Sequence, residues 1–329
     1  MFTRRAMLAA AAGVVASRVT DSWAQPVFPT RPVTIVAPFT PGTPADVAAR
    51  RVAQAMTGTL SQSVVVENRS GAGGTTGSEY VARAEPDGYT LIAGTQSTHA
   101  INVGLYRNLR YHPTHSFAPI SRISSAPNVV VVAATLKVRT MTELIALAKQ
   151  QNAEGRPLSF GSGGSGTTAH RGAEVLKQAA GINLVHIPYR GTSQAMTDVL
   201  TGRVDMMFAP IVVALPHVQS GAVRGLSITS PDRSPLLPQV PTVREAGLPE
   251  AETEVWIGLF APARTPDAVI GTLYDGLVRA LKLPAVHHDF GKEGSDVVID
   301  ASPAAFSRFV DEEIATWAKV VQQSGATIE

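Results

Sequence analysis

Apolar and polar positions along the chain form two series, in which short β-branched runs alternate with stretches of helical spacing. The first series opens with the run at residues 33–39, passes through a turn rich in Gly and Pro, and then shows helical spacing over residues 46–60. Further strands are expected at residues 63–69 and 89–95, with a helical stretch between them. This alternation predicts a parallel sheet wrapped by helices.

A second series begins with the β-branched run at residues 128–134. Prolines recur through residues 231–249 and favour an ordered surface excursion there, because a central strand cannot lose so many N–H donors. The two series predict two lobes. The second series contains expected helices at residues 140–151, 169–180 and 192–202 and strands at residues 158–160, 182–190 and 204–210, and helices around residues 266–281 and 303–323 end the chain.

The bulk composition is that of a globular protein. The chain has 329 residues, of which 44% are hydrophobic and 16% are charged, so it is long enough for two domains with separate cores. It contains no cysteine. The absence of cysteine excludes disulfides, Cys-ligated metals, thiol catalysis and a lipoprotein anchor.

The N-terminus has the features of an export signal. Arg4 and Arg5 precede an uncharged run over residues 6–16, and a small-x-small cleavage site ends at Ala24. The run is too short to cross a bilayer, so residues 1–24 are predicted to be removed and the protein to be periplasmic. Both the twin-arginine route and the general secretory route remain open.

Removal of this leader changes the net charge. The leader holds three of the 28 basic residues and one of the 26 acidic residues, which leaves 25 of each sign in the remaining chain. A neutral chain of this kind lacks the basic surface that nucleic acids need. No nucleic-acid partner is therefore expected.

The stretch "LSFGSGGSGTTAH", residues 158–170, nearly satisfies three enzymatic motifs. Gly161, Gly163 and Gly166 match the dinucleotide fingerprint G-x-G-x-x-G. The same residues fit a P-loop except that Thr167 stands at the lysine position, and a nucleophile elbow around Ser165 also fails at Thr167. The stretch therefore indicates no single enzymatic site, and no catalytic residue is predicted.

A dinucleotide site also needs an acidic residue at the end of the next strand. That strand ends instead with Tyr189 and Arg190. Because an arginine can hold the 2′-phosphate of NADP, an exported NADP-dependent oxidoreductase remains the alternative function.

The shared physical feature of these motifs is a turn rich in Gly and hydroxyl groups at a helix N-terminus, where free amides attract an anion. Residues 38–46, "PFTPGTPAD", repeat this construction in the first series. Two such turns predict a clamshell that holds a small anion at the carboxyl ends of the strands. A plain helix cap is the competing interpretation.

Metal binding is not expected. His112 and His115 are separated by a proline and have no third ligand nearby. With cysteine absent, no other cluster of metal ligands has a recognisable spacing. No cofactor is predicted.

Blocks in a fixed order, from about Arg31 to the C-terminus, carry a family resemblance. Among them are "RPVTIVAPFTPGTPADVAAR", "VVENRSGAGGTTGSEYVARAEPDGYTL", "LSFGSGGSGTTAHRGAEVL" and "VHIPYRGTSQAMTDVLTGRVDMMF". Together they resemble the Bug-family receptors, the extracytoplasmic solute-binding components of tripartite tricarboxylate transporters.

The resemblance implies an α/β, two-lobed periplasmic binding protein of type-two topology without enzymatic activity. Residues 25–124 and 261–329 would form the first lobe and residues 125–260 the second. A small mono- or dicarboxylate would bind between the lobes. The partners would be the large and small transmembrane subunits of the transporter, and the receptor itself would be a monomer.

The two turns supply most of the expected ligand contacts, and Tyr189 and Arg190 are expected at the far end of the ligand. One departure from the family pattern concerns the first turn, where Thr43-Pro44-Ala45 replaces a glycine and small residues. Pro44 removes an N–H donor and Thr43 adds a hydroxyl, which implies a shifted ligand preference or weaker binding. The expected ligand-binding residues are Thr40, Thr43, Ala45, Asp46, Gln96, Ser97, Ser162, Gly163, Ser165, Thr167, His170, Tyr189 and Arg190.

Overall fold

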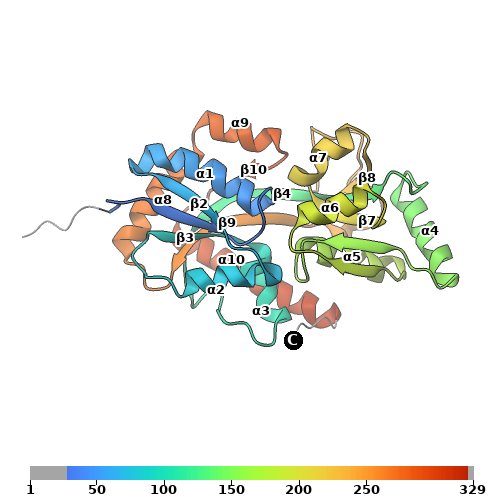
Figure 1. Cartoon of the computed structure of the whole chain (residues 1–329), viewed down its shortest axis with the longest axis horizontal. Helices are drawn as coiled ribbons and strands as arrows, with labels where there is room; N and C mark the ends of the chain where they lie inside the picture. The colour runs from blue at the N-terminus through green and yellow to red at the C-terminus, as the bar shows by residue number, and fades with distance from the viewer. Residues whose placement is uncertain (1–27, 325–329) are drawn as a thin grey trace, which may run out of the picture.

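The computed structural model describes residues 28–324, which form a mixed sheet covered by helices (Figure 1). The predicted leader, residues 1–24, lies outside the described residues. The strands are β1 (Val33–Ala37), β2 (Val64–Asn68), β3 (Thr90–Thr95), β4 (Phe117–Ala133), β5 (Ser159–Ser162), β6 (Val185–Pro188), β7 (Met206–Pro210), β8 (Val223–Ile228), β9 (Glu254–Pro262) and β10 (Asp296–Val297).

The helices are α1 (Pro44–Leu60), α2 (Thr75–Ala82), α3 (Asn102–Leu105), α4 (Met141–Ala153), α5 (Thr168–Ala180), α6 (Thr192–Leu200), α7 (Ile211–Gln219), α8 (Asp267–Leu281), α9 (Pro284–Lys292) and α10 (Pro303–Ser324). The predicted helices are present, and the structure adds α3, α7 and α9, which the sequence pattern did not predict. Short helical turns occur at η1 (Ala72–Gly74), η2 (Ser97–Ile101) and η3 (Pro249–Ala251).

The strand order confirms an α/β fold built from two similar halves. One half has the order β2-β1-β3-β9-β4, and the other has the order β6-β5-β7-β4-β8. Within each half the first three strands are parallel, and the long strands β4 and β9 add antiparallel pairings. Parallel strands of this kind bring the turns that follow them to one edge of the sheet.

Strands β4 and β9 connect the two halves and run across the middle of the molecule (Figure 1). Over residues 117–127, β4 pairs with β9, which also pairs with β3. From Asn128 onward β4 pairs with β7 and β8 instead. We call residues 28–127 and 254–324 the first lobe and residues 128–253 the second lobe.

Helix α1 shows how the sequence specifies the first lobe. Pro44 is its first residue, where a missing N–H costs nothing, and the helix ends at Ser61 in a left-handed conformation. Its buried residues include Ala49, Val52 and Met56, at the spacing of one helix face. This face packs on the sheet in a core that also contains residues of α8 and α9.

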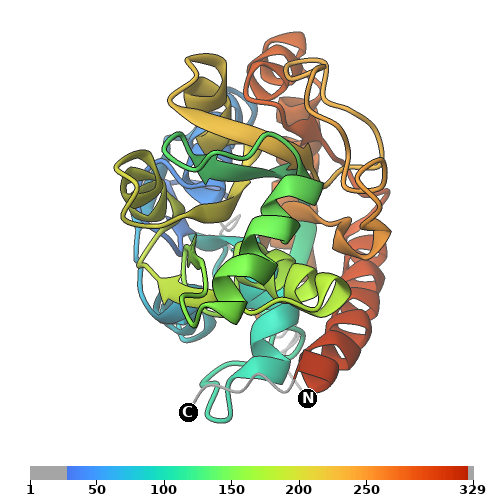
Figure 2. The same cartoon turned by 90° about the vertical axis from the view of Figure 1, so that its right-hand side faces the viewer.

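The second lobe has a core on each side of its sheet. Phe160 and Phe208 lie fully buried in the core beneath α4 and α5, and Met207 lies in the core beneath α6 and α7. The proline-rich excursion contributes to both cores, because Leu237 and Val243 are completely buried. The excursion is therefore a packed part of the lobe. Figure 2 shows this lobe nearest the viewer, with α10 along one edge.

Candidate functional site

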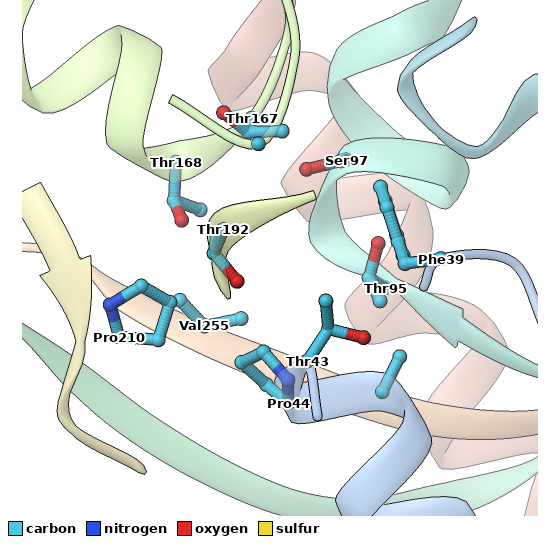
Figure 3. Close-up of a pocket in the computed structure, with 12 residues that line it drawn as sticks. Phe39, Thr43, Pro44, Thr95, Ser97, Thr167, Thr168, Thr192, Pro210 and Val255 are labelled. Carbon is cyan, nitrogen blue, oxygen red and sulfur yellow. The ribbon is translucent and has the colours of Figure 1, made fainter. Parts of the chain in front are cut away.

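A cavity lies between the lobes at the carboxyl ends of the strands, and Figure 3 shows its lining. Its volume is about 40 Å³, which is room for a few water molecules or a small polar group. Residues from both lobes line it, and none of them is charged: Phe39, Thr43, Pro44, Ala45, Thr95, Ser97, Gly163, Thr167, Thr168, Thr192, Pro210 and Val255.

Three helix N-termini meet at this cavity. Helix α1 begins at Pro44, α5 at Thr168 and α6 at Thr192, and each of these residues lines the cavity. Each end carries a partial positive charge and N–H groups that have no partner within the helix. The convergence creates an anion-binding environment without a cationic side chain in the lining.

The three helix ends differ in how their N–H groups are satisfied. On α5, the hydroxyl of Thr167 accepts a hydrogen bond from the backbone N–H of His170 at 3.3 Å. Within the described residues, neither Thr43 at the start of α1 nor Gly191 at the start of α6 caps its helix with a side chain. The amides available to a ligand therefore belong mainly to α1 and α6, which face each other from opposite lobes.

Thr192 provides a second, independent indication of a polar ligand. Thr192 is 8% exposed, and its Oγ1 has no hydrogen-bond partner among the residues that the structure describes. The same holds for Oγ1 of Thr40, on the turn before α1. A buried hydroxyl without a partner costs about 1–3 kcal/mol, so such a group is expected to have a partner in the working state. Figure 3 shows the Thr192 hydroxyl inside the ring of lining residues.

The lobes contact each other at two glycines of the first lobe. A Cβ atom on Gly42 would lie 3.4 Å from Oγ of Ser193 in the other lobe. A Cβ atom on Gly73 would lie 2.9 Å from the carbonyl oxygen of Ser165, so these backbones are also in close contact. The lobes are thus closed around the cavity.

Five of the residues expected from the sequence line the cavity. Thr43 and Ala45 come from the turn before α1, and Ser97 follows β3 in the first lobe. Gly163 and Thr167 come from the glycine turn of the second lobe. The hydroxyl of Thr167 also donates to the carbonyl of Gly164 at 2.8 Å, so its hydrogen bonds are already made within the protein.

Two expected residues of the first lobe, Asp46 and Gln96, make hydrogen bonds to other residues of the protein. The carboxylate of Asp46 accepts from Gly42 N, Arg50 Nε and Asn68 Nδ2 at 2.8–2.9 Å. Burial alone would raise the pKa of Asp46, but these hydrogen bonds outweigh it and hold the pKa below its usual value. Gln96 donates to the carboxylate of Glu313 at 2.6 Å and does not line the cavity.

Two expected residues of the glycine turn, Ser162 and His170, make hydrogen bonds that hold the turn in place. Ser162 lies 2.6 Å from Nε2 of His186 and donates to the carbonyl of Gly164. Nδ1 of His170 accepts from the backbone N–H of Gly166 at 3.2 Å. Neither Ser162, Ser165 nor His170 lines the cavity.

Tyr189 and Arg190 are the residues expected at the far end of the ligand. The Tyr189 hydroxyl donates to Asp198 at 2.6 Å, while burial and this carboxylate raise the pKa of Tyr189 to about 12. Arg190 is exposed. Neither residue lines the cavity.

Several lining residues were not among those expected. Thr192 follows β6 and opens α6, which repeats the pattern of strand, turn and helix that pointed to Thr43 and Thr167. Pro210 ends β7 and directly precedes α7. Val255, in contrast, lies on β9 and carries no sequence signal for the site. The full set is Phe39, Pro44, Thr95, Thr168, Thr192, Pro210 and Val255.

A second cavity, of about 290 Å³, lies at the junction of β4, β9, α5 and α10. Arg171 of α5 reaches it and stacks on the ring of Trp317 at 4.3 Å. Glu313 lies on the same cavity and accepts hydrogen bonds from Trp256, at 2.7 Å, and Trp317, at 3.2 Å. The carboxylate beside Arg171 makes this cavity less favourable for an anion than the uncharged cavity between the lobes.

Replacing Thr167 with valine is expected to lower the free energy of unfolding of the ligand-free protein by about 1 kcal/mol, because α5 loses its N-cap hydrogen bond. Urea denaturation of the variant and the wild type measures this difference. Unchanged stability would contradict the capping role and leave Thr167 free for a ligand.

Three buried or partly buried histidines are held neutral by their surroundings. Burial lowers the pKa of His99 to about 3. Burial and the positive charges that His170 and Lys177 carry when protonated lower the pKa of His186 to about 3. Burial also lowers the pKa of His170, whose ring stacks on that of His186 at 4.1 Å. The folded protein therefore binds fewer protons than the unfolded chain in mildly acidic solution.

The free energy of unfolding is expected to fall as the pH drops below about 6.5, since the unfolded chain then takes up protons that the folded protein excludes. Each histidine contributes up to about 1.4 kcal/mol per pH unit. Urea denaturation at about pH 7.5 and at about pH 5.5 measures the difference in the free energy of unfolding. Both pH values lie above the range in which most carboxylates titrate. His186→Phe should reduce the pH dependence. An unreduced dependence in His186→Phe would refute this assignment.

Two further observations concern the whole of the described chain. No group of three or more His, Cys, Asp or Glu side chains suited to a metal ion occurs within residues 28–324. In the same part of the chain, no helix has the length and apolar character needed to span a membrane.

Comparison with known proteins identifies one family model and several solved structures that are similar to this chain. The model of the tripartite tricarboxylate transporter family receptor matches residues 48–326. The structure of the periplasmic binding protein BugD is similar, with 34% identity, a TM-score of 0.87, and coverage of 92% of this chain and 100% of BugD. The Rhodopseudomonas palustris protein MatC, solved with bound malate, has 33% identity, a TM-score of 0.83, and coverage of 89% and 100%.

A second Rhodopseudomonas palustris protein, solved with adipate, has 34% identity and a TM-score of 0.86, with coverage of 92% of this chain and 100% of that protein. The structural matches span both lobes of the present chain. They confirm the predicted fold of a two-lobed α/β periplasmic binding protein.

Proposed function

The chain belongs to the tripartite tricarboxylate transporter family of receptors, and we propose that it captures a small organic carboxylate between its lobes and delivers it to the membrane subunits of such a transporter. The observation that carries the proposal is the meeting of the uncapped α1 and α6 N-termini at a cavity that contains the unpartnered hydroxyl of Thr192. A carboxylate supplies acceptors for the amides and for this hydroxyl at once.

The proposed contacts come from both lobes. The backbone N–H of Ala45 would bind from the first lobe, where the Thr43 hydroxyl already donates to the carbonyl of Thr40 at 2.8 Å. Thr192 with the first amides of α6 would bind from the second lobe. Thr40 lies close to Gly191 across the lobes, and its free hydroxyl supports a role for it when the ligand is bound. Such contacts exist only when the lobes are closed, so binding would be coupled to closure.

We further propose that the lobes defined by strand pairing move as units, with β4 and β9 as the connection between them. This division begins the second lobe near the predicted boundary after residue 124. It returns the chain to the first lobe at the start of β9 rather than after residue 260. The closed surface presented by both lobes would then be the one that the transmembrane subunits bind.

The family is one of periplasmic receptors and not of enzymes, which argues against an exported NADP-dependent oxidoreductase. The residue that supported that alternative, Arg190, is exposed and away from the cavity. The proposed export signal at residues 1–24, cleaved near Ala24, agrees with a periplasmic location.

Thermal unfolding in the presence of small acids tests the proposal. A ligand at about 100 times its dissociation constant should raise the free energy of unfolding by about 2.7 kcal/mol. We expect stabilisation by at least one carboxylate and none by NADPH. Stabilisation by NADPH with no response to any carboxylate would refute the proposed function.

A further inference from the structure

We propose that Arg171 is a positioning residue for ligand capture, because it reaches from the second lobe to Trp317 of the first lobe and holds the two lobes together in the closed state. The inference rests on the proposed coupling between ligand binding and closure. Cζ of Arg171 lies 4.3 Å from the centre of the Trp317 ring. A guanidinium at this distance over the face of a tryptophan is attracted by the ring, and most strongly where water is excluded.

The two stacked side chains belong to different lobes. Arg171 lies on α5, which packs in a core of the second lobe through Ala173 and Leu176. Trp317 lies on α10, in a core that also contains Val36 of the first lobe. Figure 1 shows α10 reaching towards the second lobe on the side of α5. The stack therefore crosses the boundary between the lobes.

Hydrogen bonds within the first lobe fix the ring on which Arg171 stacks. Trp317 is 4% exposed, and its Nε1 donates to the carboxylate of Glu313, one turn earlier on α10, at 3.2 Å. The same carboxylate accepts from Trp256 at 2.7 Å and from Gln96 at 2.6 Å. A ring held in this way loses little conformational freedom when a side chain of the other lobe stacks on it.

The surroundings of Arg171 strengthen its attraction to the first lobe. Arg171, Trp317 and Glu313 all line the cavity of about 290 Å³ at the junction of the lobes. Burial lowers the pKa of Arg171, and the negative charge of Glu313 acts in the opposite direction. The guanidinium is thus partly removed from water and faces a carboxylate of the other lobe. Such an attraction is stronger than that of an exposed ion pair, because water screens it less.

Helix α5 links this contact to the ligand cavity. Thr167 and Thr168, at the start of α5, line the cavity between the lobes, and Arg171 follows within the next turn. The helix connects these positions as one rigid element. A movement that withdraws α5 from the first lobe would therefore break the stack on Trp317 and open the ligand cavity together. By favouring the closed arrangement, the stack raises the affinity for any ligand that binds only to it.

Closure can be measured without a ligand, because the chain contains no cysteine. A Cβ atom on Gly191 would lie 3.3 Å from Cβ of Thr40 in the other lobe, close to the separation in a disulfide. In the parent variant Thr40→Cys/Gly191→Cys, the rate of disulfide formation with a fixed oxidant reports how often the lobes close. Adding Arg171→Met should slow this reaction by about threefold to thirtyfold, the range expected for the loss of a partly buried cation–π contact.

Lys177→Met in the same parent is the matched control, since Lys177 lies on the same helix, carries the same charge and pairs with Glu174 of that helix. Its rate should equal that of the parent. Arg171→Lys should restore part of the rate, because lysine keeps the charge but not the planar stack. Trp317→Leu should slow the reaction as Arg171→Met does, and the two changes together should slow it no further.

An unchanged rate in Arg171→Met would overturn the inference, and so would an equal loss in Lys177→Met. Additive losses in the combined Arg171→Met/Trp317→Leu variant would show that the two residues act separately, which also overturns it. A parent that forms no disulfide would contradict the closed arrangement on which the inference depends. Because no ligand is present, these outcomes are read separately from the proposed function, whose failure would appear in the thermal unfolding experiment with small acids.

Discussion

Replacing Gly191 with alanine is expected to weaken ligand binding by about tenfold to a hundredfold, the range expected from overpacking a closed interface. Gly191 precedes α6, and a Cβ atom placed on it would overlap Oγ1 of Thr40 in the other lobe. Its φ of −172° is extended, so the substitution itself introduces no backbone strain. The clash therefore opposes closure and not folding.

The ligand-free Gly191→Ala protein should lose at most about 1 kcal/mol of stability, because alanine is a poorer N-cap than glycine. Gly58→Ala is the matched control on α1, where a Cβ atom would meet nothing within 4 Å. Calorimetric titration should show normal binding in the control. Wild-type affinity in Gly191→Ala would show that the contact between Thr40 and Gly191 does not form when ligand binds.

Replacing Thr192 with valine should have opposite effects on binding and on stability. Valine has nearly the shape of threonine but lacks the hydroxyl that the structure leaves without a partner. The ligand-free variant should be as stable as the wild type or up to about 1 kcal/mol more stable, because no buried polar group is left unpaired. Its affinity should fall by about tenfold to a hundredfold, the value of a hydrogen bond to a charged group.

Urea denaturation and calorimetric titration of the same Thr192→Val preparation measure both effects. Thr167→Val is the informative comparison, because Thr167 lines the same cavity but its hydroxyl caps α5 and should be needed for stability. If Thr192→Val were destabilised like Thr167→Val, Thr192 would have a structural role. Undiminished binding would exclude it as a ligand contact.

The fold was predictable because its signals are local. The β-branched run that became β1 and the helical spacing that became α1 each depend on residues close in sequence, and the same is true of β5 and α5. The first half of β4 was not predicted. Residues 117–127 contain Ser, Arg and Pro, and they form a strand because β9, far away in the sequence, pairs with them.

The lining of the cavity was predictable where a strand leads through a turn into a helix. Thr43, Ala45, Gly163 and Thr167 were found in this way, and the same rule applied to the turn after β6 would have found Thr192. Val255 could not be found from its neighbours. It reaches the cavity because β9 passes between the lobes.

The expected polar residues that do not line the cavity have a common feature. Asp46, Gln96 and Tyr189 all stand near strand ends, but each is hydrogen-bonded to another side chain of the protein. The sequence shows that a polar group is present and does not show whether its partner is a ligand or a neighbouring residue. Among the residues that line the cavity, the hydroxyl that such pairing leaves over within the described part of the chain is that of Thr192.

The most direct test of the account is a crystal structure of the protein with the small acid that stabilises it most. We predict that the carboxylate lies within hydrogen-bond distance of Thr192 Oγ1 and of backbone amides at the starts of α1 and α6, with no charged side chain in contact. A carboxylate bound instead by the guanidinium of Arg171, in the cavity beside Trp317 and Glu313, would contradict the central claim.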